Sequence, residues 1–364
     1  MSTTVPVSTS APVSTTVPVS TSVPQRRRPP AMSDVAALAG VSHQTVSRVL
    51  NDHDSVRPET RARVQDAIAQ LGYRRNSAAR ALVTRRSGII GVVTTESALY
   101  GPTSTLVALG GAARDIGYFV SVATIAQFDA EAMHRALEHF MGQGVEGIVI
   151  IAPQDEASAA VETFDAAVPV VMVMSGVQPP TQSLRWVGVE QHEGARLATR
   201  HLIEAGHREV VHLTGPLNCF DGRARLEGWT AECTAAGLVL PEPIVGDWTA
   251  ERGYAVGRDL ARQGAPTAVF AANDELALGL LRAFWEAGLR VPHDVAVVGF
   301  DDIASSAYFI PPLTTVRQDF AALGRLAIRA LTDALAGVDE LLAPIPTSLV
   351  IRASSLEEPY PRKA

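Results

Sequence analysis

Short β-branched segments alternate with helical stretches beyond Ser87, and this alternation constrains the fold more than any other feature of the 364-residue chain. Helical stretches such as Ala130–Gln143, Gly194–Ala205 and Glu275–Ala287 separate most of the candidate strands. Strand and helix in alternation predict parallel sheets with crossover helices. We therefore expect residues 88–364 to form an α/β body of two doubly wound lobes. The predicted strands are Ile89–Thr94, Phe119–Thr124, Gly147–Ile151, Val168–Met174, Val210–Thr214, Ala268–Ala272, Asp294–Gly299 and Thr314–Arg317.

A small all-α unit, the head, is predicted before the body, in residues 32–75. Its first helix is expected over Asp34–Ala39, with Ser33 as the N-cap. Gly40 can adopt the positive φ of a tight turn, and Ser42 can cap a second helix. Two short helices around a glycine turn are typical of a helix-turn-helix.

The second and third helices complete the predicted head. The second runs to about Asn51 and turns Val46 and Val49, three residues apart, toward the interior. Pro58 is expected to start the third helix, and Gly72 to stop it. The residues that this helix should bury are Val64, Ile68 and Leu71.

The second helix of a helix-turn-helix lies in the major groove, where its N-terminal residues meet base edges. This arrangement turns His43, Gln44 and Arg48 outward. Gln can bond an adenine edge bidentately, and Arg a guanine edge; a solvated polar face is the alternative interpretation. Phosphate contacts position a head without reading sequence. The residues expected to make them are Thr45, Ser47 and Tyr73.

Charge is distributed unevenly along the chain. Residues 25–86 contain twelve Arg, no Lys and five acidic residues, a net charge of +7, whereas the whole chain carries −7 and the remainder therefore −14. A basic module on an acidic body is expected of a nucleic-acid-binding unit joined to a self-contained second unit. A solvated basic surface would also account for the charge taken alone.

The first 31 residues differ from both modules. Residues 1–24 carry no charged side chain, and Thr3–Ser10 recurs as Thr15–Ser22. A segment rich in Ser, Thr and Pro cannot bury a core, so we expect residues 1–31 to be a disordered low-complexity tail. Met32 is a second candidate for the start of the working protein.

Composition argues against several classes of protein. The chain is 47% apolar and 19% charged, as in soluble globular proteins. No segment reaches the roughly 18 consecutive apolar residues of a membrane span, and the N-terminus lacks the pattern of a secretory signal. Cys219 and Cys233 match neither a metal spacing nor a disulfide framework, so we expect reduced thiols in a cytoplasmic protein.

Sequence motifs of the common α/β enzymes are absent. There is no G-x-G-x-x-G after a strand, no phosphate loop and no G-x-S-x-G elbow. Asp301-Asp302 and the histidines at 201, 207 and 212 lack convincing metal-site spacing. We therefore expect no enzyme, no metal and no cofactor, but a small-molecule effector.

The sequence of the head, over residues 32–51, resembles the lactose-repressor/galactose-repressor family of transcription regulators. The resemblance covers essentially the whole chain after residue 31. It implies two Rossmann-like, periplasmic-binding-protein-like lobes with a ligand in the cleft between them. Further matching stretches are Arg57–Arg61, Leu71–Tyr73, Gly206–His207, Gly246–Trp248, Pro266–Ala268, Ala272–Asp274, Val298–Asp302 and Pro311–Phe320.

The resemblance also implies a hinge helix and linker over residues 76–87. In this family the hinge helix forms on operator DNA, with Asn76 as the expected cap and Leu82 as a wedge between base pairs in the minor groove; an ordinary linker residue is the alternative for Leu82. Such a short helix is unstable alone, so a change in the body can control it. Arg57 departs from the family, which usually has Ser or Thr there, and weakens the cap of the third helix.

The effector cleft is expected beyond the carboxyl ends of the strands, where open α/β sheets bind ligands. Asn273, Asp301 and Arg225 follow predicted strands and suit sugar hydroxyls, because Asp accepts, Arg donates and Asn does both. Capping or ion-pair roles are the alternative. Trp248 offers a flat face to a sugar ring, or packs as a surface aromatic. The other candidates are Leu99, Tyr100 and Pro102 of the first lobe, with Gln318 and Phe320 at the crossover between lobes.

Two departures from the family concern the sugar. Met174-Ser175-Gly176 stand where the family often has a polar or acidic ligand residue, and Ile151 stands where a member has a polar contact. The first lobe should therefore make fewer hydrogen bonds, which leaves a larger or differently placed glycoside open.

These patterns predict a repressor of carbohydrate-utilisation genes that a sugar or glycoside releases from a pseudo-palindromic DNA operator. A homodimer is expected because operators mirror protein symmetry, and the lack of a terminal leucine heptad favours a dimer over a tetramer. The expected location is the cytoplasm, in association with the nucleoid. The alternative is the sugar-binding module of a transport system, which would share the body but not the basic head.

Overall fold

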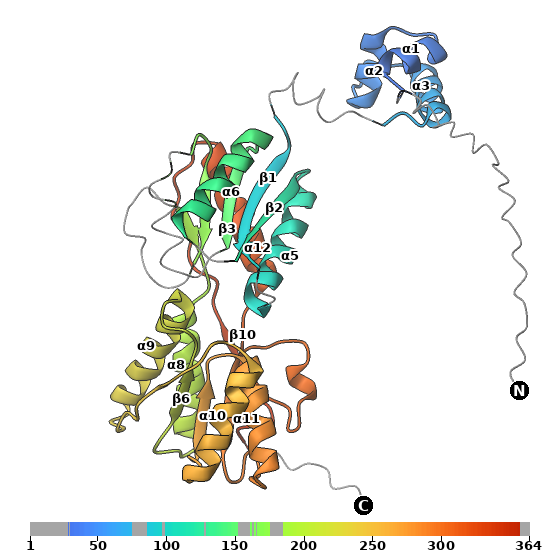
Figure 1. The fold of residues 1–364 in the computed structure, drawn as a ribbon. Coiled ribbons are helices and arrows are strands. Elements are labelled where there is room, and N and C mark those ends of the chain that lie inside the picture. The colour runs from blue at the N-terminus through green and yellow to red at the C-terminus, as the bar shows by residue number, and fades with distance from the viewer. Residues whose placement is uncertain are drawn as a thin grey trace, which may run out of the picture. The chain divides into compact units, whose positions relative to one another are not determined.

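The computed structural model describes residues 28, 30–74, 86–96, 99–126, 129–151, 161, 164, 166–174 and 185–356. The chain divides into two compact units, residues 1–77 and 78–364, drawn in Figure 1. The first contains the head and the second the body, and each is described by itself. The predicted hinge helix, with Asn76 and Leu82, lies outside the described residues.

The head contains three helices, α1 (Met32–Ala39), α2 (His43–Leu50) and α3 (Pro58–Leu71), as expected for a helix-turn-helix with a supporting third helix. Gly40 and Gly72 end α1 and α3 at φ +61° and +62°, the left-handed conformation that glycine tolerates best. The bundle is held together by a small core, in which Val35, Val46 and Val64 are fully buried.

Two details of the head differ from the sequence prediction. Helix α1 begins at Met32, so Ser33 is not its cap; the N-cap is Ala31, whose N–H donates to the Asp34 carboxylate at 2.7 Å. An acidic residue in the first turn thus replaces the missing cap side chain. In α3, Val64 and Ala67 are buried, whereas Ile68 and Leu71 are only partly buried.

Two cap predictions for the head are confirmed. The Ser42 hydroxyl accepts the Thr45 N–H at 3.1 Å, which makes Ser42 the cap of α2. Arg57 occupies the N-cap position of α3 without a side-chain cap bond.

The first lobe of the body is a parallel five-stranded sheet in the order β2-β1-β3-β4-β5. Helix α6 (Ala130–Gln143) packs on one face through Met133 and Leu137. Helices α5 (Tyr100–Asp115) and α12 (Phe320–Leu335) cover the other face (Figure 1). The strands are β1 (Ile89–Thr95), β2 (Phe119–Ile125), β3 (Gly147–Ile151), β4 (Val170–Val173) and β5 (Arg185–Val187).

The second lobe has a six-stranded sheet in the order β11-β10-β9-β8-β6-β7, in which only β11 is antiparallel to its neighbour. Helices α8 (Gln191–Glu204) and α9 (Phe220–Ala235) cover one face, and α10 (Ala250–Gln263) and α11 (Asp274–Glu286) the other. The strands are β6 (Val211–Thr214), β7 (Ile244–Val245), β8 (Ala268–Ala271), β9 (Ala296–Asp301), β10 (Thr314–Arg317) and β11 (Ser348–Val350). A 3-10 turn, Ser306–Tyr308, follows β9.

The chain passes between the lobes at three places: from β5 to α8, from β10 to α12, and from α12 back to β11. The first and third passages lie side by side, because Val189 and Ile345 form a parallel bridge. Residues near these passages can therefore contact both lobes.

The fold class predicted from the sequence, an all-α head with two doubly wound lobes, is confirmed. Strands β3 and β10 have the predicted bounds, whereas β5, β7 and β11 were missed because two to three residues carry too little pattern. The strand predicted over Asp294–Gly299 is shifted to Ala296–Asp301, so Asp301 ends the strand rather than following it.

Candidate functional site

A pocket that is open to solvent lies between the lobes of the body. It is formed at the carboxyl ends of strands, because the last residues of β3, β4 and β9 line it, as does Asn273, two residues after β8. All nine residues predicted to bind the effector line it: Leu99, Tyr100, Pro102, Arg225, Trp248, Asn273, Asp301, Gln318 and Phe320.

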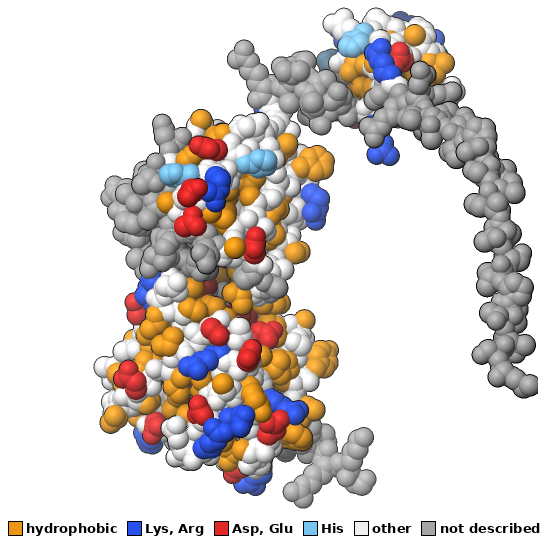
Figure 2. Space-filling view, in the orientation of Figure 1, with side chains coloured by type: hydrophobic (Ala, Val, Ile, Leu, Met, Phe, Trp, Pro, Cys, Tyr) orange, Lys and Arg blue, Asp and Glu red, His pale blue; other side chains and the backbone are white. Residues whose placement is uncertain are grey.

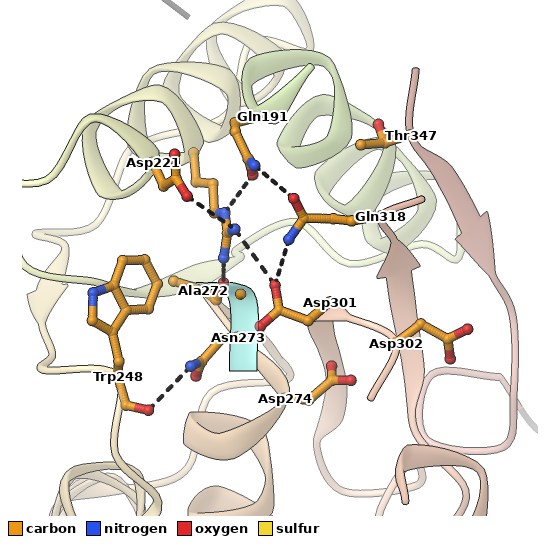
Figure 3. A network of polar contacts seen from close by, with 12 residues as sticks. Gln191, Asp221, Trp248, Ala272, Asn273, Asp274, Asp301, Asp302, Gln318 and Thr347 are labelled. Atoms are coloured by element: carbon orange, nitrogen blue, oxygen red, sulfur yellow. Dashed lines mark hydrogen bonds and ion pairs between the residues drawn. The ribbon is translucent and has the colours of Figure 1, made fainter. Parts of the chain in front are cut away.

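Four of the lining side chains form a closed ring of polar contacts, shown in Figure 3. Arg225 Nε donates to Gln191 Oε1 at 2.9 Å, and Gln191 Nε2 donates to Gln318 Oε1 at 2.7 Å. Gln318 Nε2 donates to Asp301 Oδ1 at 2.7 Å, and Arg225 Nη2 lies 3.5 Å from the same oxygen. The ring joins two of the three lobe passages to the second turn of α9 and to the end of β9.

Arg225 is only 3% exposed, and its guanidinium is held on several sides. Besides the ring contacts, its Nη1 donates to the Ala272 carbonyl oxygen, and Asp221 lies 4.0 Å from Nη2. The aromatic rings of Phe300 and Trp248 lie 3.8 Å and 5.3 Å from the guanidinium carbon. A guanidinium group enclosed on so many sides is held in a single orientation at the wall of the pocket.

Asp301 supplies the carboxylate of the site. Burial raises its pKa to about 6, although Arg225 and Gln318 favour the ionised form. Both ring contacts go to Oδ1. Among the described residues none bonds Oδ2, which can therefore accept a hydrogen bond from a ligand hydroxyl.

Asn273 caps a helix and also lines the pocket. Its Oδ1 accepts the Leu276 N–H at 2.8 Å and so caps α11. Its Nδ2 donates to the Trp248 carbonyl oxygen at 3.0 Å, which anchors Trp248 at its positive φ of +73°. One N–H and one lone pair of the amide stay available to a ligand.

The indole of Trp248 packs over Gly215. A Cβ added at Gly215 would lie 2.1 Å from the indole, so no larger residue fits beneath the ring. Trp248 is half-buried and lines the pocket, so its indole packs on the protein and also borders the space open to a ligand.

The first lobe contributes a mainly apolar wall. Ile151, Val173 and Met174 lie at the ends of its strands, and Tyr100 packs edge-on against Phe320 at 5.6 Å between ring centroids. Thr105, a polar lining residue of this wall, donates its hydroxyl to the Gly101 carbonyl of its own helix. The predicted polarity difference between the lobes is therefore present among the described residues, although Ser175 and Gly176 lie outside them.

Sequence reasoning missed Gln191 and Asp221. Gln191 is 2% exposed and connects Arg225 to Gln318. Its position at a passage between the lobes, like that of Gln318, could have identified it. It was missed because α8 was predicted to begin at Gly194, three residues after its observed start. Asp221 lies one helical turn before Arg225, a spacing too common to be informative.

The helix-turn-helix surface places the predicted base-contacting residues outward. His43, Gln44 and Arg48 are exposed on α2, whereas Thr45 and Ser47 are partly buried. Tyr73 is 9% exposed and belongs to the head core, so its ring packs inward and only its hydroxyl is suited to a phosphate. Tyr73 follows α3 and is buried because it packs against core residues of the three helices, an arrangement that the local sequence does not reveal.

The described part of the chain has neither a metal-binding cluster nor a membrane-spanning helix. No group of three or more His, Cys, Asp or Glu residues there could hold a metal ion. None of the helices described is long and apolar enough to cross a membrane.

The two units match two known kinds of domain. A model of the lacI family of bacterial regulatory proteins matches residues 31–76, and a model of the periplasmic binding protein-like domain matches residues 199–355. The lactose operon repressor of Escherichia coli (strain K12) is 38% identical over 336 residues, which span 90% of this chain and 91% of that protein.

Solved structures agree with these matches. The lac repressor dimer bound to operator and the anti-inducer ONPF has a TM-score of 0.83 at 36% identity, covering 91% of this chain and 100% of that one. The CelR–cellobiose complex has a TM-score of 0.67 at 33% identity, covering 89% and 99%. The chain belongs to the lacI family of bacterial regulatory proteins.

Proposed function

We propose that this protein is a transcriptional repressor that binds a pseudo-palindromic operator as a homodimer and is released by a sugar or glycoside bound between the lobes. It acts as a regulator and not as an enzyme, without a cofactor, and works in the cytoplasm on the DNA of the nucleoid. The target genes on this proposal are those of carbohydrate use.

The observation that carries the proposal is the buried polar ring that lines an otherwise apolar-walled pocket. Arg225, Gln191, Gln318 and Asp301 present fixed donors and an acceptor on one side. Apolar side chains and the Trp248 indole face them. Sugars have this same two-sided chemistry, with hydroxyls around an edge and C–H groups on the ring faces. Cellobiose bound to CelR and ONPF bound to the lac repressor are of this class.

The exposed residues of α2 support the DNA half of the proposal. Gln44 and Arg48 are suited to adenine and guanine edges, with His43 beside them. The exposed Arg28, Arg57 and Arg63 add positive charge to the head. Thr45, Ser47 and Tyr73 would position the head on the phosphates. Asn76 would cap the hinge helix, and Leu82 would bend the duplex in the minor groove.

A homodimer is the assembly that a two-fold operator requires. Large apolar side chains are exposed on both lobes, among them Phe119 (72%), Tyr308 (84%) and Ile310 (89%). Elsewhere on the visible face of the body, acidic and basic side chains alternate in small groups (Figure 2). We propose that the exposed apolar residues pair the two subunits.

Release would follow from differential affinity. Sugar bound to the ring would favour one arrangement of the two lobes. The two hinge helices of the dimer would then separate, and the two heads would no longer fit both operator half-sites at once, so operator affinity would fall. A transport module, the alternative interpretation of the body, has no use for a head that matches the lacI family over residues 31–76.

The test captures DNA from the fragmented source genome with the purified full chain and sequences what is retained. The proposal expects a pseudo-palindrome with a central pyrimidine–purine step, near sugar transport or glycosidase genes, and release by the sugar of those genes. The Gln44→Ala, Arg48→Ala double variant is the control and should lose this enrichment. Recovery of no specific sequence from the wild type would contradict the proposal.

A further inference from the structure

Asp274 is a fully buried carboxyl group just behind the pocket. It is the first residue of α11, its exposure is 0%, and it does not line the pocket. Its Oδ2 accepts the Ile303 N–H at 2.9 Å, and its Oδ1 accepts the Thr315 hydroxyl at 2.5 Å. One side chain thus ties together α11, the segment after β9, and β10.

Each of these three anchoring points is close in sequence to a polar residue of the pocket. Asn273 precedes Asp274, Asp301 lies two residues before Ile303, and Gln318 lies three residues after Thr315. Figure 3 shows the Asp274 carboxyl between Asn273 and Asp302, below Asp301 in this view. The mutual positions of the three ligand-facing groups therefore depend on this carboxyl group.

The backbone beside Asp274 needs such an anchor. Asp301 and Asp302 have φ values of +112° and +51°, both in the region that favours glycine. Strained residues of this kind persist only when their surroundings hold them. Asp302 is held by Arg317 and Arg352, each at 2.6 Å, and its N–H donates to the Thr315 hydroxyl at 3.3 Å.

The sheet provides a space for the carboxyl group. A Cβ added at Gly299 would lie 2.3 Å from Asp274 Oδ1, so the group fills a volume that only glycine leaves free. Burial, and next the nearby Asp301 carboxylate, raise the pKa of Asp274 well above its usual value. Both carboxyl oxygens accept hydrogen bonds, and an Asn side chain would keep one such acceptor.

We propose that Asp274 is a positioning residue of the effector site: without touching the ligand, it holds Asn273, Asp301 and Gln318 at their mutual distances. The inference deepens the proposed function, because it assigns a role in effector affinity and none in contact with DNA.

The experiment compares full-length Asp274→Ala, Asp274→Asn and Thr315→Val with the wild type. Hydrogen–deuterium exchange of residues 296–318 is measured without ligand, and cellobiose and ONPF binding by calorimetry. Ser354→Ala is the matched control, because the Ser354 hydroxyl is also fully buried and joins β9 to β10, through Val297 and Thr314, away from residues 301–303.

We expect Asp274→Ala to speed exchange at residues 301–303 and to weaken sugar binding by roughly tenfold, the usual effect of leaving a buried N–H without its acceptor. Asp274→Asn should restore both in part, because its carbonyl oxygen can still accept the Ile303 N–H, whereas its amide nitrogen cannot accept the Thr315 hydroxyl. Thr315→Val removes the hydroxyl that donates to Asp274 while leaving the carboxyl group in place. It tests the positioning role if the alanine variant does not fold.

The inference is overturned if exchange at residues 301–303 in Asp274→Ala or Thr315→Val does not exceed that in Ser354→Ala. It is also overturned if the Asn variant behaves like the Ala variant. If the wild type binds neither sugar, the proposed effector class fails, while the exchange result still decides the positioning role.

Discussion

At the scale of single residues, the body is organised around one buried cation. Arg225 cannot lose its charge, so its burial requires partners that stay in place. Each guanidinium nitrogen has its own partner: Nε contacts Gln191, Nη1 the Ala272 carbonyl oxygen and Nη2 Asp301. The donors that face the pocket are then available to a ligand in a fixed direction, without a further ordering cost on binding.

Arg225→Ala is expected to abolish the response to the sugar while leaving operator affinity within about twofold, because the head and its exposed Gln44 and Arg48 are untouched. Operator binding with increasing sugar, followed by fluorescence anisotropy, measures both effects. Arg200→Ala is the matched control: its Arg pairs with Glu232 on the outer helices of the same lobe, away from the pocket. Sugar release from Arg225→Ala equal to that from the wild type would refute the assignment of Arg225.

The raised pKa of Asp301, about 6, predicts pH-dependent sugar affinity. The ionised form accepts from ligand hydroxyls and pairs with Arg225, so affinity should be complete above neutral pH. Below pH 6 it should fall by up to about tenfold per pH unit. Calorimetry between pH 5 and 8 measures this, and Asp301→Asn, weaker throughout, should show no such slope.

The effect of the same group on folding has the opposite sign to that of a usual carboxylate. Its pKa is raised from 3.8 to about 6, so the folded chain binds its proton more tightly than the unfolded chain. Its contribution to the free energy of unfolding therefore decreases as the pH rises through this interval.

At the scale of elements, helix beginnings set the positions of the functional side chains. Asn273 caps α11 and lines the pocket, Ser42 caps the helix that carries Gln44, and Asp319 caps α12 beside Phe320. Helix N-termini expose unpaired N–H groups, so a side chain that satisfies them is held rigidly. Not every helix has such a cap: α1, α3, α5, α8 and α9 begin without a side-chain cap bond, and in α3 the N-cap residue is Arg57.

Arg57→Ser is expected to stabilise the head by about 1 kcal/mol, because a hydroxyl at this position can accept an N–H of the first turn of α3. Hydrogen–deuterium exchange in residues 58–71 of the full chain, at increasing urea, measures the change. Ser42→Ala should produce the reverse effect in α2. Equal exchange in Arg57→Ser and the wild type would count against the uncapped state of α3.

At the scale of the whole molecule, the two units have separate tasks and opposite charge. The head presents arginines, and the larger body is acidic overall. Within the body, Gln191 and Gln318 lie at passages between the lobes and belong to the ring that faces the ligand. A ligand that bonds to the ring would therefore contact the segments that connect the two lobes, and these segments determine how the lobes are oriented to each other.

Operator affinity should fall steeply with salt, by roughly a thousandfold or more between 50 and 200 mM if the dimer neutralises six or more phosphates. Titrations of operator DNA across this range measure the slope. Gln44→Ala should lower affinity without changing the slope, because a base contact releases no counterions. A flat dependence for the wild type would contradict the phosphate role of the basic head.

Periodicity and turn chemistry were sufficient to predict the architecture. The alternation of strands and helices, Gly40 and Gly72 at helix ends, and Ser42 at a helix start all depend on local preferences that act within a few residues. Asn273, Asp301 and Arg225 were found because the ends of parallel strands meet at one edge, a rule that depends on topology alone.

What only the tertiary structure decided involves contacts between distant segments. The ring from Gln191 to Gln318 joins residues 127 positions apart, the burial of Tyr73 depends on the packed head, and Asp274 is surrounded by β9 and β10. Short strands such as β7 exist only because a neighbouring strand pairs with them. By itself the sequence determined the elements and the edge where the site lies, because local propensity and hydrophobic period set these; which polar groups meet there was decided by packing between segments far apart in the chain.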